Sequence, residues 1–553
     1  VGHRDGHAAG RGAGPALSAR AVTPEEWIAH DPDPVTAAEL AACDPAELAA
    51  RFAHPLTFGT AGLRGPVRGG PDAMNVAVVL RATWAVARVL HDRGLGGATV
   101  VVGRDARHGS EAFATAAAEV FAAQGFRVIA LPHPAPTPVV AFAVRRTGAA
   151  AGVQITASHN PARDNGYKVY VDGGLQIVSP TDREIEAAIA GAPPADEIAR
   201  QTVEPTDTSL LDAYVHRAAA VRRGHDPVRI ALTAMHGVGG ELALRTLEAA
   251  GFDDVHVVAS QFEPDPDFPT VAFPNPEEPG ATDALLRTAE RVGAGIAIAL
   301  DPDADRCAVG VPTEHGWRML SGDETGWLLG DFILARLGRP AAADAVVASS
   351  VVSSQLLAAI AADHGARHVQ TLTGFKWLAR ADDGIPGARL VYAYEEAIGH
   401  CVDPEAVRDK DGISAAVLAC DLVSGLGARG SSVPAALDEL ARRHGVHTTA
   451  AVSRAAASPD EAAAMMARLR DHPPRELAGI PVTVTDLLQR TDAVILAGGD
   501  AGASVRMVVR PSGTEPKVKC YTEVRLSPDP DLVGARSRAT ALQSRLLAAA
   551  RGW

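Results

Sequence analysis

Apolar residues follow two alternating spacings along the chain, and these spacings predict helices and strands. Residues 74–94, MNVAVVLRATWAVARVLHDRG, place apolar side chains at the period of a helix. The next segment, GATVVVGRD at residues 97–105, is a short apolar run of strand length. The pattern recurs at 113–132, where a helical stretch ends at Gly125, a residue suited to a helix C-terminus, before FRVIALP. Helices that alternate with short strands predict βαβ units and a parallel or mixed sheet.

This helix–strand rhythm starts again twice further along the chain. It restarts at 227–258 and at 345–372, each time after a linker-like stretch, GAPPADEI and RMLSGDETG respectively. From about residue 447 the pattern changes to one expected of antiparallel strands with helices. We therefore predict an α/β protein with three similar mixed-sheet α/β domains and a smaller C-terminal α+β domain. The expected division is a flexible extension at 1–20, rich in Gly, Ala and Arg, and domains at 21–205, 206–322, 323–446 and 447–553.

Composition narrows the class of protein and its partners. The chain is 47% apolar and 21% charged, as folded soluble domains are. A net charge of -14 argues against a nucleic-acid partner, although a few focused Arg and Lys side chains can still bind a small anion. No apolar run approaches the length of a membrane-spanning helix, so we expect no membrane partner. The five scattered cysteines form no C-x-x-C pair, which favours a reducing cytoplasm.

Three acids follow a strand-like run in AGIAIALDPDADRCAVG. Asp301, Asp303 and Asp305 are spaced two apart, so they can share one face of a strand or converge in a tight loop. Carboxylate oxygens suit a hard divalent cation such as Mg²⁺, and α/β proteins place ligands where strands end. The alternative is an acidic surface turn that closes a strand.

Two loop-like stretches contain groups suited to phosphate chemistry. Ser158 lies in TASHNP, where it is either a nucleophile, a phosphate carrier or a polar turn residue. In RPSGTEPK, small residues let backbone N–H groups approach an anion, while Arg and Lys supply positive charge. An ordinary Pro-Ser-Gly turn explains the small residues equally well. The candidate phosphate ligands are Arg510, Ser512, Gly513, Thr514 and Lys517.

Weaker candidates surround these stretches. Glu395 and Glu396, in VYAYEEAIGH, can accept hydrogen bonds from sugar hydroxyls, but paired glutamates are more often a solvated helix start. Lys376, in TGFKW, and His400 are candidates for acid/base work or for steadying a phosphate. FGTAGLRG, residues 58–65, surrounds Arg64 with glycines, an arrangement that suits an anion or a plain loop.

Together these stretches resemble the α-D-phosphohexomutase superfamily, the phosphoglucomutase/phosphomannomutase enzymes. TASHNP is similar to the phosphoserine loop of that family, DPDADR to its metal loop and RPSGTEPK to its phosphate loop. FGTAGLRG, TGFKW, EEAIG and DKDGISAAV are most similar to the phosphoglucomutase-2/phosphopentomutase-like branch. The resemblance implies four domains around a central cleft and a mutase that interconverts hexose 1-phosphate and hexose 6-phosphate. It also implies Mg²⁺, a sugar 1,6-bisphosphate intermediate that also acts as activator, and a sugar phosphate as the partner of a monomer or homodimer.

The resemblance also implies a role for each candidate. Ser158 would be the phosphorylated serine, and it would complete the Mg²⁺ shell of the three aspartates. Arg306 would lie beside the transferring phosphoryl group, and Glu395 or Glu396 would face the sugar. Other implied roles are acid/base work for Lys376, positive charge near the phosphoserine for Arg64 and Lys168, loop shaping for His159, and the second phosphate site for Arg510, Ser512, Thr514 and Lys517.

One departure from the family and three rival readings leave the substrate and mechanism open. Many bacterial members have a Gly-Glu-x-Ser-Gly sugar loop, whereas Ile398 stands here in place of the serine and its hydroxyl. The preferred sugar is expected to be glucose, with mannose or a pentose as alternatives. A phosphatase-like rival would use Asp301 as nucleophile and leave TASHNP and RPSGTEPK without a role. An inactive sugar-phosphate binder would be expected to lack the serine or an acid, and none is missing. A serine hydrolase is disfavoured because no G-x-S-x-G elbow is present.

Overall fold

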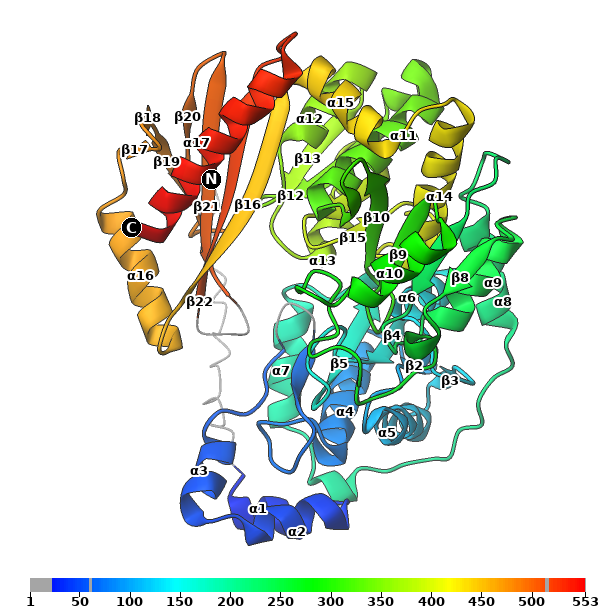
Figure 1. Cartoon of the computed structure of the whole chain (residues 1–553). Coiled ribbons are helices and arrows are strands. Elements are labelled where there is room, and N and C mark those ends of the chain that lie inside the picture. The colour runs from blue at the N-terminus through cyan, green and yellow to red at the C-terminus, as the bar shows by residue number, and fades with distance from the viewer. Residues whose placement is uncertain (1–21, 59–61, 513–516, 553) are drawn as a thin grey trace, which may run out of the picture.

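The computed structural model describes residues 22–58, 62–512 and 517–552, and these form four units, each built on its own sheet (Figure 1). We call them units I to IV in chain order. The expected extension at 1–20 lies outside the described residues. The prediction of three similar α/β units followed by an α+β unit with antiparallel strands is confirmed.

Unit I is a mixed sheet with helices on both faces. The strand order is β1-β5-β4-β2-β3, with β6 on the edge of β5, and β5 runs antiparallel to its neighbours. Alternate side chains of β2 face opposite layers, because Val100 and Val102 pack with α4 and α5 while Val101 packs with α6. Its strands are β1 Leu63–Pro66, β2 Thr99–Arg104, β3 Arg127–Ala130, β4 Ala151–Ile155, β5 Asp164–Val171 and β6 Leu175–Gln176. Its helices are α1 Pro24–Ala29, α2 Pro34–Ala42, α3 Pro45–Ala53, α4 Val76–Asp92, α5 Ser110–Ala123, α6 Thr137–Thr147, α7 Thr181–Ala190 and the short η1 Ala195–Glu197.

Unit II repeats this plan with fewer helices. Its sheet order is β11-β10-β9-β7-β8, with β8, β7 and β9 parallel and the β9–β10–β11 meander antiparallel. The strands are β7 Ile230–Thr233, β8 Val255–Val257, β9 Ile296–Leu300, β10 Cys307–Thr313 and β11 Gly316–Met319. The helices are α8 Ser209–Ala219, α9 Gly240–Ala249, η2 Ala259–Gln261 and α10 Asp283–Val292.

Unit III has the order β13-β12-β14-β15, in which the first three strands are parallel and β15 returns antiparallel to β14. The strands are β12 Ala345–Ser350, β13 Arg367–Thr371, β14 Arg389–Glu395 and β15 Gly399–Cys401. The helices in this part of the chain are α11 Gly322–Ala342, α12 Leu356–His364, α13 Phe375–Leu378, α14 Gly412–Ala428 and α15 Val433–His444.

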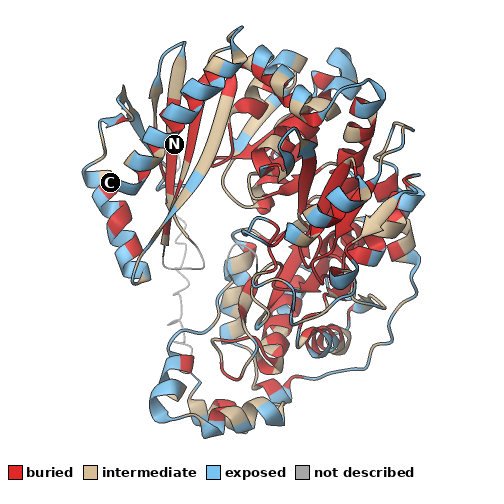
Figure 2. Ribbon diagram, viewed as in Figure 1, coloured by how far each residue is buried: buried red, intermediate tan, exposed pale blue. Residues whose placement is uncertain are grey.

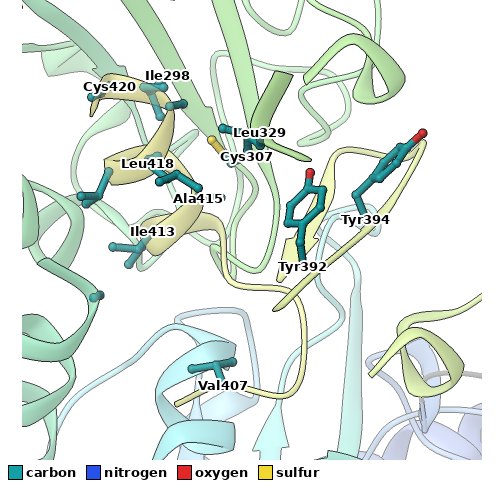
Figure 3. Packing of buried hydrophobic residues seen from close by; sticks show 14 of the residues in the cluster. Ile298, Cys307, Leu329, Tyr392, Tyr394, Val407, Ile413, Ala415, Leu418 and Cys420 are labelled. Atoms are coloured by element: carbon teal, nitrogen blue, oxygen red, sulfur yellow. The ribbon is translucent and has the colours of Figure 1, made fainter. Parts of the chain in front are cut away.

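Helix α14 joins units II and III. It follows β15 in the sequence, yet it packs against α8, α9, β9 and β10 of unit II. Figure 3 shows Ile413, Ala415 and Leu418 of α14 near Ile298 and Cys307 of the unit II strands. Because these side chains share one core, the two units are expected to move together.

Unit IV is an antiparallel sheet of order β16-β22-β21-β20-β19 with a separate small hairpin. Figure 2 shows β16 only partly buried, in contrast to the central strands of the other units. The strands are β16 Val446–Ala455, β17 Glu476–Leu477, β18 Ile480–Pro481, β19 Thr483–Asp486, β20 Val494–Gly499, β21 Ala503–Pro511 and β22 Lys517–Leu526, and the helices are α16 Pro459–Asp471 and α17 Leu532–Gly552.

Within the described part of the chain none of the five cysteines forms a disulfide, and four of them are buried. No single helix among the described residues is long and apolar enough to cross a membrane, although α14 and α15 would qualify as a bent pair by length and composition alone.

Candidate active site

The site is built from three equivalent loops, one in each α/β unit. Each loop connects the last parallel strand to the antiparallel strand that follows it: β4 to β5, β9 to β10 and β14 to β15. Each also contains a non-glycine residue in the left-handed region: Ser158 at φ 54°, Ala304 at φ 51° and Ile398 at φ 54°. Such backbone strain persists only where surrounding contacts impose it, and it is concentrated at functional sites.

Direct contacts bring the three loops together. The Ser158 hydroxyl donates to Asp301 Oδ2 over 3.0 Å, which joins units I and II. Arg306 forms a bridge with Gly399, and its guanidinium donates to the Ala397 carbonyl at 3.1 Å, which joins units II and III. The loop that contains Ser158, the loop of the three acids and the loop that contains Glu395 and Glu396 therefore meet at one place.

Arg107 fixes the conformation of the serine loop. Its guanidinium donates to the carbonyl oxygens of Ser158 at 2.7 Å and Asn160 at 2.6 Å, and also to those of Pro161 and Asp164. Ser158 itself is 2% exposed. The hydroxyl is thus held rigidly against the acids.

The three aspartates form a candidate metal centre. One oxygen from each lies within 4.8 Å of the others, and all three residues are fully buried. Among the residues that the structure describes, Asp303 Oδ1 and Asp305 Oδ1 have no hydrogen-bond partner although both atoms are buried. Unpartnered buried carboxylate oxygens are costly, and this donor set fits a hard divalent cation.

Two buried lysines neutralise part of this acidic cluster. Lys168 Nζ lies 2.6 Å from Asp303 Oδ2 and 2.9 Å from Asp305 Oδ2, and Lys410 Nζ lies 3.2 Å from the latter oxygen. Burial alone would raise the pKa of Asp303, but the Lys168 ammonium lowers it well below its usual range. Burial would lower the pKa of Lys410, but Asp305 and Asp409 raise it, so this lysine stays charged.

His159 and Arg64 lie beside the serine loop. His159 Nδ1 is 3.3 Å from the Ser158 hydroxyl, and burial, helped by Arg306 and Arg64, lowers the pKa of the imidazole well below its usual value. The ring is therefore neutral at pH 7. Arg64 donates to Asn160 Oδ1 at 3.1 Å. Residues 59–61 of the same glycine-rich stretch lie outside the described residues.

The two glutamates of the third loop have different environments. Glu396 is braced by unit III, since its Oε2 accepts hydrogen bonds from Ser350 at 3.1 Å and Ser353 at 3.2 Å. The Glu395 side chain has no hydrogen-bond partner within the described parts of the chain. Burial raises the pKa of its carboxyl group, and the positive charges of Lys410 and Arg306 oppose that shift. Glu395 is thus the acid left available to a ligand.

The structure does not bring His400 or Lys376 to the acidic cluster. His400 is fully buried, its Nδ1 is 3.0 Å from the Tyr392 hydroxyl, and its ring stacks with Tyr392 and Tyr394. Lys376 lies next to Trp377, and burial lowers the pKa of its ammonium while Asp182 opposes the shift. No contact within the described segments joins either side chain to the three aspartates.

The candidate phosphate loop is the β21–β22 hairpin of unit IV. The Ser512 N–H donates to the Lys517 carbonyl at 2.8 Å, and Arg510 pairs with Lys519 across the two strands. Gly513 and Thr514 lie outside the described residues. The Lys519 ammonium of this hairpin lowers the pKa of Glu277, a residue of the segment before α10 in unit II, and so opposes the effect of desolvation.

Sequence reasoning missed three residues of this site. Arg107 follows β2 in GRDARHG, Lys410 lies in DKDG, which carried the resemblance but received no role, and Glu277 lies in an irregular loop without a motif. Glu277 Oε2 is 3.6 Å from the Arg306 guanidinium, and although 37% of its side chain is exposed, partial desolvation of the carboxylate raises its pKa to about 7. Only the Lys410 motif offered a signal, because a lysine between two acids points to a charge network.

Comparison with known families covers most of the chain between residues 55 and 530. Sequence models of phosphoglucomutase/phosphomannomutase match alpha/beta/alpha domain I at residues 55–195, domain II at 212–315 and domain III at 321–444. The C-terminal domain of the same family matches residues 483–530.

Individual relatives have several names. The chain is 38% identical to a probable phosphomannomutase of Haemophilus influenzae, over 82% of this chain and 93% of that protein. It is 33% identical to the mouse (Mus musculus) phosphopentomutase, over 91% and 90% of the two chains. It is 32% identical to the human (Homo sapiens) glucose 1,6-bisphosphate synthase, over 87% and 86%. The crystal structure of a putative phosphomannomutase from Thermus thermophilus superposes with a TM-score of 0.68 at 25% identity, over 89% of this chain and 99% of that one.

Proposed function

The chain belongs to the phosphoglucomutase/phosphomannomutase family, and from that premise we propose that it interconverts hexose 1-phosphate and hexose 6-phosphate through a phosphorylated Ser158. The resemblance to the phosphoglucomutase-2/phosphopentomutase-like branch is confirmed by relatives named probable phosphoribomutase and phosphopentomutase. The observation that carries the proposal is the Ser158 hydroxyl, held on a strained loop 3.0 Å from the buried Asp301 carboxylate.

The proposed reaction moves one phosphoryl group twice. A sugar hydroxyl oxygen attacks the phosphorus on Ser158, the bond from phosphorus to the serine oxygen breaks, and the hydroxyl proton passes to a base. The product is a sugar bisphosphate, which turns over in the site and returns its other phosphoryl group to the serine. A fixed second phosphate site must accept either end, and the proposed ligands are Arg510, Ser512, Thr514 and Lys517, together with the Gly513 backbone.

Charge on the transferring group must be neutralised beside three aspartates. Asp301, Asp303 and Asp305, with a phosphoryl oxygen on Ser158, would hold Mg²⁺, and a bound cation of this kind neutralises negative charge on a transferring phosphoryl group. The Lys168 and Lys410 ammonium groups already face these acids, and Arg306 supplies a further charge next to them. Removal of water from the site strengthens each of these interactions.

Two groups are candidates for the proton transfer. Lys376 was predicted from its motif, but its ammonium contacts neither the acids nor the serine among the described residues. Glu277 lies 3.6 Å from Arg306, the residue next to the acids, and its pKa is raised to about 7. A positioned base of matched pKa typically contributes about 10²–10⁴-fold to the rate. We propose Glu277 as that base and Glu395 as the acceptor of sugar hydroxyls.

Ser158→Ala tests the phosphoserine with Ser544→Ala as the matched control. Ser544 is exposed on α17, and its hydroxyl donates to the Thr540 carbonyl of the same helix. We expect mutase activity with a sugar bisphosphate activator to fall by about 10³-fold or more in Ser158→Ala and to be unchanged in the control. Undiminished activity of the Ser158 variant contradicts the proposal.

The preferred sugar is a finer proposal. We favour glucose, with mannose tolerated, because Glu395 reads hydroxyl positions that several sugars share. The second candidate is a pentose phosphate, which is favoured by the relatives named phosphopentomutase and phosphoribomutase. The ratios of kcat/KM for glucose, mannose and ribose 1-phosphates decide between them, and a higher value for ribose rejects glucose as the preferred sugar.

We also propose that the enzyme acts as a monomer or homodimer in a reducing cytoplasm. Five cysteines without a disulfide among the described residues support the reducing compartment. Light scattering during size-exclusion chromatography measures the assembly, and a tetramer would reject the proposed state.

A further inference from the structure

A cavity rich in arginine lies away from the site described above, where units II and III meet. Its volume is about 760 Å³, within the range of small-molecule sites. We call it the arginine pocket and define it by its lining. The lining combines four arginines with two acids and an apolar wall: Arg217, Arg223, Arg336 and Arg389, then Asp403 and Glu405, then Ile333, Leu337, Leu390, Val391, Val402 and Leu418.

The acids near this pocket do not neutralise all four guanidinium groups. Arg217 pairs with Asp403 through two hydrogen bonds of 2.6 and 2.8 Å. Arg336 donates to the buried Asp421 at 2.7 Å. Arg389 lies 3.6 Å from Glu405, a longer contact between two exposed side chains.

Arg223 is the least satisfied of the four. Its backbone N–H binds Asp421, but its exposed guanidinium makes no hydrogen bond or ion pair within the part of the chain that the structure describes. In a chain of net charge -14, a pocket with an excess of positive charge is a local exception. Guanidinium groups bind phosphate through two parallel hydrogen bonds, and the apolar wall favours a ligand with an apolar part.

The pocket is connected to the catalytic groups through two elements. The segment 402–405 lines the pocket and runs on through Val407, buried in the core in Figure 3, to Asp409 and Lys410. Lys410 then reaches Asp305 at 3.2 Å. Helix α8 also contributes to the pocket, through Arg217, and its Tyr214 hydroxyl donates to Asp411 at 2.7 Å.

We propose that the arginine pocket binds an organic phosphate with an apolar or aromatic body, of about the size of a nucleotide, and that this ligand alters turnover. Arg223 and Arg389 bind the phosphoryl group, and the apolar wall contacts the body. Binding changes the position of 402–405 and α8, and both elements position the segment that contains Lys410.

A direct binding measurement tests the site without relying on activity. The probe is fluorescent methylanthraniloyl-ATP, titrated into the full-length enzyme in the presence of saturating glucose 6-phosphate, so that the catalytic phosphate sites are occupied. The test variant is Arg223→Glu/Arg389→Glu, and the matched control is Arg339→Glu, an exposed α11 arginine outside the pocket lining. We expect probe affinity to fall by about tenfold or more in the double variant and to be unchanged in the control.

Three results would overturn the proposal. The first is equal affinity in all three proteins. The second is displacement of the probe by glucose 6-phosphate, which would place it at the catalytic site. The third is displacement by inorganic phosphate as effective as by ATP, which would exclude an organic ligand. Coupling is tested with unlabelled ATP, which should change kcat of the wild type and leave kcat of the double variant at the value measured without ATP.

Discussion

Gly412 contacts the backbone of the metal loop so closely that a single methyl group should disturb catalysis. It is the first residue of α14, and its N–H donates to the Ala304 carbonyl at 3.1 Å. A Cβ at this position would lie 2.4 Å from the Arg306 carbonyl oxygen and 2.7 Å from the Ala304 carbonyl oxygen. Both obstacles are backbone atoms of the loop that contains the three aspartates, so no side-chain rotation relieves them.

The expected magnitudes follow from that clash. To restore an ordinary contact the loop must retreat by roughly 1 Å, a displacement that can lower the rate about 10²-fold. Overpacking costs about 1–3 kcal/mol, while replacing a helical glycine by alanine returns about 0.5–1 kcal/mol. Gly412→Ala should therefore lose about 1–2 kcal/mol of stability net and lower kcat/KM by about 10²-fold.

The matched control is Gly427→Ala in the same helix, where an added Cβ meets nothing within 4 Å. This variant should keep wild-type kcat/KM and gain slightly in thermal stability. Coupled mutase assays and thermal unfolding measure both quantities. Wild-type kcat/KM in Gly412→Ala would refute the argument that α14 fixes the metal loop.

Three further predictions concern charged groups. Glu395→Gln should lower kcat/KM for the sugar phosphate and leave the melting temperature unchanged. Glu396→Gln should lower the melting temperature, because Glu396 accepts hydrogen bonds from Ser350 and Ser353. Equal effects of the two variants in both assays would contradict these separate roles. The wild-type kcat/KM should rise with pH through about 7 as Glu277 ionises. Glu277→Gln should remove this rise in the pH profile but keep the separate rise near pH 6 that reflects ionisation of the substrate phosphate. An unchanged profile would reject Glu277 as the base. Burial raises the pKa of Asp323 to about 6, so as the pH rises from about 4 to 6 the unfolded state releases a proton that the folded state keeps. The free energy of unfolding should therefore fall by up to about 3 kcal/mol as the pH rises across that window. Asp323→Asn should flatten this fall in chemical unfolding, and an equally steep fall in the variant would be contrary evidence.

Local pattern was enough to predict the repeated units and the acidic cluster. The helical period at 74–94 became α4, Val76–Asp92, and the apolar run before Asp301 became the fully buried β9. Both features depend on residues close together in the sequence, where spacing and burial are directly related. The convergence of Asp301, Asp303 and Asp305 likewise follows from one tight loop.

Contacts between distant segments could not be read from local pattern. Nothing in the spacing of residues 412–428 indicates that α14 packs on unit II and delivers Lys410 to Asp305. His400 looked available because it follows the glutamates, yet its pairing with Tyr394 across the β14–β15 hairpin turns it into the core. Such placements depend on the register of the hairpin and on which helices cover it.

The most direct test of the account is to find which atom carries the phosphoryl group. Brief incubation with a radiolabelled sugar bisphosphate, followed by peptide mapping, should place an acid-stable, base-labile label on the peptide that contains Ser158. Ser158→Ala should take up no label. A label that hydroxylamine removes, on the peptide that contains Asp301, would contradict the phosphoserine mechanism.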